Sequence, residues 1–179
     1  MTDTKQLVIL KRLTTLIEGI TTDNGYDYDL VGRVFRGKTV FGDSEPVPFV
    51  SILESLRPDP NPLEAGDEKL VREEQWDLLI QGWARTTQAL PTDDLYNLKG
   101  AIEHRLSRMI ALVNGSPAFL DDYRLGRDGT GSRGGLITGA RIGPGVVRAA
   151  TPQTGGVAAL YLPVTICYKA DVSDPWALS

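Results

Sequence analysis

The stretch QWDLLIQGWA, residues 75–84, is a strand candidate with apolar side chains at both odd and even positions. Because side chains alternate between the two faces of a strand, this pattern predicts that both faces are covered. A layer of helices can cover one face, and a partner subunit is a candidate for the other. Trp76 and Trp83 lie on this strand, and we interpret them as core or interface residues rather than as a platform for stacking bases.

An amphipathic helix is predicted before this strand, near the N-terminus. Apolar side chains recur at steps of three and four residues from Leu7 to Ile20. Asp3 or Thr4 can cap the helix, and Asn24-Gly25 is predicted to end it.

A second amphipathic helix is predicted after the strand, from Thr92 to the Asn114-Gly115 pair. Thr92 is the predicted N-cap, and Asp93 and Asp94 lie in the first turn, where the helix dipole favours acids. The apolar stripe of this helix consists of Leu95, Leu98, Ile102, Leu106, Met109, Ile110 and Val113.

Four other segments have strand-like composition. Residues 29–42 predict a strand or a hairpin that turns near Gly37-Lys38, and residues 47–55 predict a second strand. Residues 135–150 and 156–172 are predicted to pair as a hairpin. Strands joined largely by short turns, with two helices between them, favour an α+β fold over strict β-α alternation.

The predicted architecture is a single α+β domain over residues 1–179. A mixed or antiparallel sheet is packed on one face by two main α-helices. Residues 56–74 and 116–135 are predicted to be long irregular loops, and residues 171–179 a C-terminal extension. Irregular stretches of this length are uncommon inside a compact domain unless they serve binding, which points to an assembly protein.

The composition excludes several classes of function. The net charge of -4 gives no general attraction to nucleic acid or to an anionic membrane surface. No run of eighteen apolar residues and no secretory leader is recognised, so the chain is expected to be cytosolic when made. With Cys167 and His104 as the single cysteine and histidine, no internal disulfide and no cysteine-based zinc site are expected. We predict no catalytic residue, metal site or cofactor.

Residues 32–39, GRVFRGKT, match the P-loop pattern G-x-x-x-x-G-K-T. A phosphate-binding loop needs a helix that begins at its Lys-Thr pair, whereas the residues after Thr39 cannot begin one. The residues between the two glycines alternate like a strand. We therefore interpret Arg33, Arg36 and Lys38 as charges on a half-exposed hairpin, and as candidates for contact with a neighbouring subunit or another protein.

Two further interface candidates lie outside the predicted elements. Arg124, Arg127 and Arg133 lie in the glycine-rich loop and are candidates for docking on another protein. Trp176, beyond the last predicted strand, is a candidate anchor for a neighbouring subunit. A frayed tail with an incidental tryptophan is the alternative.

Four stretches, taken in order, resemble the tail terminator (tail completion) proteins of long-tailed bacteriophages. They are LVGRVFRGKTVFGDSEPVPFVSILE, QWDLLIQGWA, LPTDDLYNLKGAIEHRL and LYLPVTICYKADVSDPW. The resemblance implies an α+β fold and a hexameric ring that sits on the last ring of the tail tube, stops its polymerisation and offers a surface to the neck proteins. It implies no catalytic residues.

The resemblance also implies partners and a location. The partners are further copies of the chain, the tail tube protein, a neck or connector protein and the tail sheath protein. DNA would pass through the ring without sequence-specific binding, and the protein would be assembled in the host cytoplasm and reside at the tail–neck junction of the virion. Two alternatives stay open: a neck or head-tail connector protein, and a small nucleotide-binding enzyme built on residues 32–39.

Overall fold

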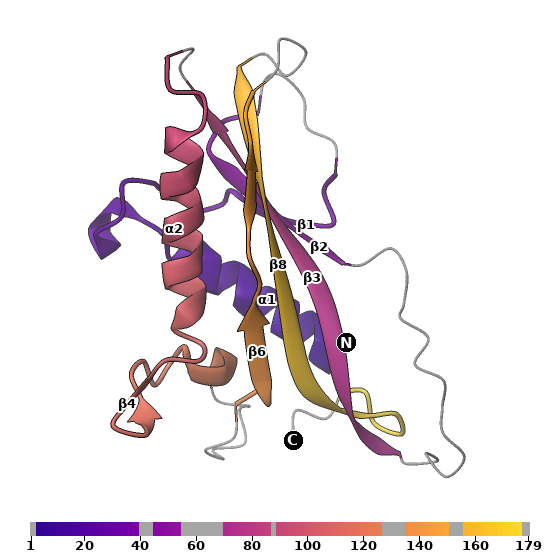
Figure 1. Cartoon of the computed structure of the whole chain (residues 1–179). Helices are drawn as coiled ribbons and strands as arrows, with labels where there is room; N and C mark the ends of the chain where they lie inside the picture. Colours follow the sequence, from indigo (N-terminus) through magenta and orange to yellow (C-terminus); the bar gives the residue numbers. More distant parts are fainter. Residues whose placement is uncertain are drawn as a thin grey trace.

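The chain folds into a mixed sheet of six strands with two main helices on one of its faces (Figure 1). This confirms the predicted α+β class and the placement of both helices on one face. The structure is a computed structural model that describes residues 3–39, 45–54, 70–86, 89–126, 135–150 and 156–176.

The helices are α1 (Lys5–Glu18) and α2 (Asp93–Ser107), with the 3₁₀ turns η1 (Thr22–Asn24) and η2 (Tyr123–Leu125). The strands are β1 (Val34–Arg36), β2 (Phe49–Glu54), β3 (Val71–Arg85), β4 (Leu112–Val113), β5 (Ser116–Pro117), β6 (Gly139–Ile142), β7 (Val146–Arg148) and β8 (Val157–Asp171). In the main sheet the order is β1-β2-β3-β8-β6, and β7 also pairs with β8. β4 and β5 form a separate two-stranded hairpin.

The centre of the sheet is the antiparallel pair of β3 and β8, whose register runs from Val71 opposite Asp171 to Arg85 opposite Val157. β6 and β7 also pair with β8, as predicted for residues 135–172. β3 begins within the predicted loop 56–74, so that prediction is wrong for residues 71–74, while residues 55–69 lie outside the described part. The error has a physical cause, because residues 72–74 are all charged and offer no hydrophobic signal.

The two faces of β3 differ in burial. Leu78, Ile80 and Ala84 point toward the helices and are buried. Leu79 and Trp83 point to the opposite face and are only half-buried. The prediction that both faces are covered is therefore confirmed within the chain for the helix side alone. We call the opposite side the outer face.

Helix α1 begins as predicted, with the N–H of Leu7 donating to Oγ1 of its N-cap, Thr4, at 3.4 Å. The predicted end at Asn24-Gly25 is wrong, because α1 ends at Glu18 and a separate 3₁₀ turn follows.

A side chain from α2 caps the C-terminal end of α1. Nε of Arg105 donates to the carbonyl of Leu16 at 2.7 Å. The guanidinium also lies over Gly19, where a Cβ atom would come within 2.3 Å of it. This contact joins residues about ninety positions apart, so the helix pattern of α1 alone did not reveal it.

Helix α2 is capped less well, and is shorter, than the sequence predicts. Thr92 precedes the first helical residue, but its side chain makes no capping hydrogen bond. The helix ends at Ser107, and Asn114 and Gly115, with φ of 52° and 76°, form the turn between β4 and β5. Asn-Gly is the preferred pair for a two-residue hairpin with positive φ at both positions, and this local preference explains why the helix does not continue. Val113 consequently lies exposed on the hairpin.

Of the two alternatives predicted for residues 29–42, the strand is confirmed as β1 and the hairpin that turns near Gly37-Lys38 is wrong. β1 pairs with β2 in parallel, from Val34 opposite Val50 to Arg36 opposite Ile52. Among the described strands, β1 therefore lies at one edge of the sheet. The predicted strand at 47–55 is confirmed as β2.

We predict that neighbouring substitutions on β3 will have unequal effects on the stability of the monomer. Ile80→Ala should lower the free energy of unfolding by about 2–5 kcal/mol, because it leaves a cavity under the helices. Leu79→Ala should cost about 1 kcal/mol, because its side chain is only half removed from water. Urea unfolding followed by circular dichroism, at concentrations where both variants are monomeric, measures the difference. Equal losses would mean that the outer face is covered within the monomer.

Candidate interaction surface

Three aromatic rings from three strands pack together at one end of the outer face. Phe49 stacks on Trp83, with ring centroids 4.8 Å apart, and Phe35 meets Phe49 edge-on at 6.2 Å. Nζ of Lys38 lies 4.2 Å from the centroid of the Phe35 ring and pairs with Glu45. The structure thus brings together two of the predicted interface residues, Lys38 and Trp83, in what we call the outer aromatic cluster.

The outer face continues from this cluster onto β8. Trp83 lies opposite Ala159, and Gln81 lies opposite Tyr161. Tyr161 in turn lies opposite the exposed Val146 of β7. Toward the far end the face becomes polar, where Thr165 donates its hydroxyl to Oδ1 of Asp77 at 2.7 Å. The apolar half of the outer face is therefore the half near Trp83.

Residues 32–39, which match the P-loop pattern, form an edge strand and the residues that flank it. β1 occupies its middle, and the N–H of Gly37 donates to the carbonyl of Ile52 at 2.9 Å. The carbonyl of Arg33 accepts the N–H of Val50 at 2.9 Å. Backbone groups that a phosphate loop directs at its ligand are thus directed at β2 instead. Arg33 is half-buried and Arg36 is exposed on this strand, not on a hairpin.

Trp76 lies on the opposite side of the sheet from Trp83. Its ring meets the ring of the buried Tyr168 edge-on, with centroids 6.1 Å apart, and packs against the hydrophobic core. Of the two interpretations of Trp76, core and interface, the contacts favour the core.

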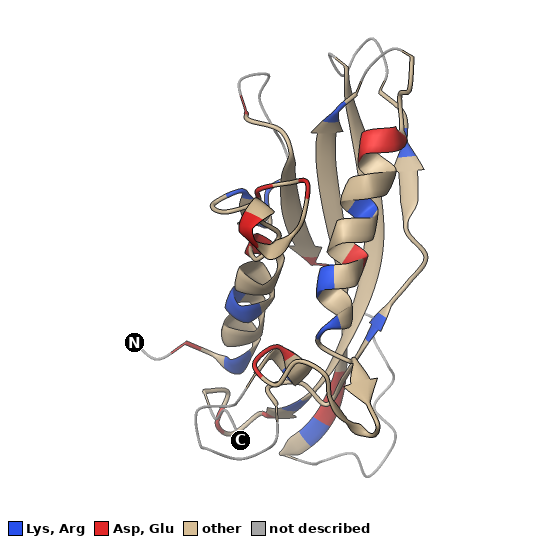
Figure 2. Ribbon diagram, turned by 90° about the vertical axis from the view of Figure 1, so that its left-hand side faces the viewer, with Lys and Arg blue, Asp and Glu red and all other residues tan. Residues whose placement is uncertain are grey.

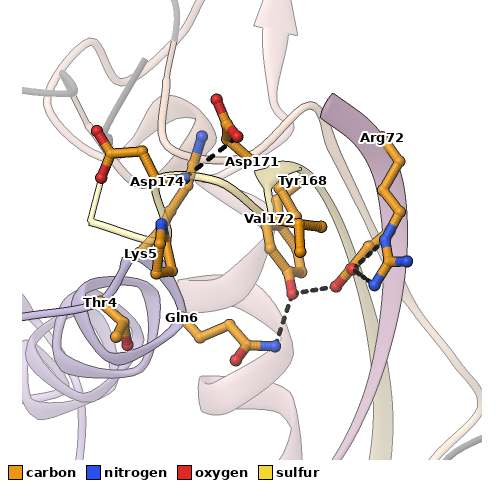
Figure 3. A pocket seen from close by; sticks show the side chains of 11 residues that line it. Thr4, Lys5, Gln6, Arg72, Tyr168, Asp171, Val172 and Asp174 are labelled. Atoms are coloured by element: carbon orange, nitrogen blue, oxygen red, sulfur yellow. Dashed lines mark hydrogen bonds and ion pairs between the residues drawn. The ribbon is translucent and has the colours of Figure 1, made fainter. Parts of the chain in front are cut away.

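A cavity of about 360 Å³ lies where the N-terminus of α1 meets the ends of β3 and β8 (Figure 3). The C-terminal segment borders it, because the N–H of Lys5 donates to the carbonyl of Pro175 at 2.9 Å. The next residue, Trp176, is 51% exposed. The residues that line the cavity are Thr4, Lys5, Gln6, Arg72, Glu74, Tyr168, Ala170, Asp171, Val172, Asp174 and Pro175.

A hydrogen-bonded chain crosses this cavity. The hydroxyl of Tyr168 donates to Oε2 of Glu74 at 2.6 Å and accepts from Nε2 of Gln6 at 2.6 Å. Nε of Arg72 donates to the other oxygen of Glu74 at 2.7 Å. Burial, followed by the hydrogen bond to Glu74, raises the pKa of the Tyr168 phenol well above its ordinary value. The neutral phenol therefore ties α1 to both central strands, and no local sequence pattern predicted this group.

The predicted arginine group is described only in part. Arg124 has a positive φ of 50°, and its N–H donates to the carbonyl of Met109 at 2.9 Å. Its guanidinium lies 5.4 Å from the Tyr123 ring centroid. Arg127 and Arg133 lie outside the described residues, so the docking role of this loop stays a prediction. Within the predicted loop 116–135, residues 116–117 and 123–125 form β5 and η2, so the prediction of an irregular loop is wrong there.

Comparison with protein-family models and with curated proteins gives no match to this chain. The resemblance to tail terminators therefore stays a prediction. Among the described residues, no group of three or more His, Cys, Asp and Glu side chains is placed to hold a metal ion. No helix in the described ranges is long and apolar enough to cross a membrane.

We predict that Tyr168→Phe will destabilise the fold by about 1–3 kcal/mol at neutral pH, because Glu74 and Gln6 lose a buried hydrogen-bond partner. Tyr161→Phe removes a hydroxyl from the outer face of the same strand and should cost much less. Thermal and urea unfolding of both variants measure the difference.

The same variant tests the raised pKa of Tyr168. A phenol whose pKa is higher in the folded state binds its proton more tightly there, so its stabilising effect is complete below about pH 10 and is lost as the pH rises further. The stability difference between the wild type and Tyr168→Phe should therefore shrink above pH 10. A difference that stays constant between pH 8 and pH 11, measured by urea unfolding, would contradict this assignment.

Proposed function

We propose that this protein is a structural virion protein, a tail terminator. Copies of the chain form a closed ring, a hexamer by resemblance, that caps the tail tube and stops its polymerisation. One side of the ring contacts the last tube ring, and the other offers the docking surface for the neck. The proposal includes no catalytic role.

The observation that carries this proposal is the apolar half of the outer face, which neither described helix covers. Leu79, Trp83 and Tyr161 are half-buried there, while both helices lie on the other face. Contiguous apolar surface rimmed by polar groups is typical of protein contact sites. An assembly partner that covers this face would bury the apolar side chains that β3 places there.

A second, different surface lies at the other end of the central ribbon. Leu70 and Val172 are exposed there, joined by a hydrogen bond from the N–H of Val172 to the carbonyl of Leu70 at 2.8 Å, and Trp176 is exposed nearby in the chain. A closed ring repeats one heterologous contact, which needs two unlike patches on each subunit. A terminator also contacts unlike proteins above and below. The outer face and this second surface are two unlike patches on one subunit, and they therefore support an assembly role.

The alternative of a nucleotide-binding enzyme loses support from the geometry of residues 32–39. Their backbone is engaged in the parallel pairing of β1 with β2, as Gly37 and Ile52 illustrate. Lys38 is engaged with Glu45 and the Phe35 ring instead of pointing at a vacant phosphate site.

The function is tested by electron microscopy of particles assembled without this protein. A missing terminator should leave tails of uncontrolled length, because nothing stops polymerisation of the tube. Tails of normal length that are detached from heads would instead identify a neck connector. Restoring the wild-type protein should restore uniform tails.

The role of the outer face is tested by Leu79→Arg. This variant should keep the circular dichroism spectrum of the wild type but lose the ring in analytical ultracentrifugation, because a charge is placed in an apolar contact. Asn97→Arg adds the same charge to the exposed side of α2 and serves as the matched control. If Leu79→Arg forms rings as the wild type does, the outer face does not join subunits.

A further inference from the structure

Two segments on the surface carry charge of opposite sign. Residues 18–31, which we call the acidic turn, contain four acids and no lysine or arginine. Residues 139–148, which we call the basic edge, contain two arginines and no acid. The acids are Glu18, Asp23, Asp27 and Asp29, and the arginines are Arg141 and Arg148.

The acidic turn is held firmly on the helix layer. The hydroxyl of Tyr26 and Nδ1 of His104 share a hydrogen bond at 3.0 Å. The hydroxyl of Tyr28 donates to the carbonyl of Asp94 at 2.7 Å. Both contacts reach α2, so Asp27, which lies between the two tyrosines, is presented from a fixed backbone.

The charges on both segments are left unpaired within the described part of the chain. The carboxylate of Glu18 accepts the N–H of Gly32 at 3.2 Å, but none of the four acids forms an ion pair with a described lysine or arginine. Arg141 is exposed, and the guanidinium of Arg148 lies 5.4 Å from the Tyr161 ring centroid. The nearest cation in sequence, Arg33, follows the acidic turn and leaves its net charge negative.

The two segments lie on different sides of the molecule. Figure 2 looks onto the helix layer, with α1 and the turn after it on the left and the β6–β7 side of the sheet on the right. In the described residues, β6 and β7 pair with β8 alone, so they border the sheet. Each segment also exposes one valine, with Val31 at 62% and Val146 at 61% exposure.

We propose that the acidic turn of one copy docks on the basic edge of the next copy, repeated head to tail. The two patches are unlike and complementary in charge, as a heterologous contact requires. The basic edge also adjoins the outer face, since Val146 lies opposite Tyr161, so one neighbour can cover both. This contact rests on the proposed ring and specifies which surfaces close it.

Charge reversal tests the contact. One variant carries Arg141→Glu and Arg148→Glu, and the other carries Asp23→Lys, Asp27→Lys and Asp29→Lys. Each variant alone presents like charges to itself, so its self-association at low salt should weaken about tenfold or more. An equal mixture should recover rings, because the intact turn of one variant matches the intact edge of the other, and the reversed turn matches the reversed edge. Sedimentation velocity measures all three samples, and circular dichroism verifies folding.

A control variant separates this effect from a change in net charge. Lys11→Glu with Arg12→Glu alters the net charge as much as the edge reversal does, but on the exposed side of α1, away from the basic edge. It should associate like the wild type. As a test that needs no substitution, raising the salt from about 0.05 M to about 1 M should weaken wild-type association, because exposed charges are then screened within about 3 Å.

The possible outcomes distinguish a failure of the proposed contact from a failure of the proposed function. Rings that persist in both reversal variants, or a mixture that stays monomeric although both chains are folded, overturn the contact and leave the ring in place. A wild-type protein that stays monomeric at low salt overturns the contact as well. The tail-length experiment judges the terminator role independently of each of these results.

Discussion

The antiparallel ladder between β3 and β8 is the constraint on which the rest of the structure depends. It joins two strands of fifteen residues, from Val71 opposite Asp171 to Arg85 opposite Val157. Its register decides which side chains face the helices, because a slip of one residue would turn every side chain to the other face. β2 adds to one side of the ladder, and β6 and β7 to the other. The buried face of the ladder is then the one that α1 and α2 cover.

The ladder is longer than the layers that cover it, and this divides the molecule into regions with different chemistry. Where helices lie beneath it, Ile80 and Leu162 are fully buried. On the reverse side, Trp83 is held by Phe49 but stays half-buried. Toward the other end, the buried Tyr168 on β8 adds hydrogen bonds to the N-terminal helix and to β3. The same pair of strands thus supports a core, an open apolar face and a polar junction.

The surfaces that remain are suited to contact with other proteins. The outer face offers aromatic and aliphatic area without a helix over it, and the acidic turn and basic edge offer complementary charge on separate sides. Apolar area contributes affinity, whereas complementary charge contributes specificity and orientation. An assembly subunit that must meet a neighbour in a single orientation needs both. The proposed terminator role combines these properties in one ring contact.

The sequence by itself determined the elements whose signals are local. Periodicity identified α1 and α2, Asp3 or Thr4 was predicted to cap α1, and the apolar run at 75–84 predicted a strand. The same run indicated two faces that need cover, and the context of residues 32–39 argued against a phosphate loop. Tertiary structure alone decided the rest, because the deciding contacts join residues from different elements. Arg105 of α2 donates a hydrogen bond to the C-terminal turn of α1. β1 pairs with β2 in parallel and does not form a hairpin. Strand alternation already places Trp76 and Trp83 on opposite faces, and the tertiary structure decided that the helices cover the face of Trp76.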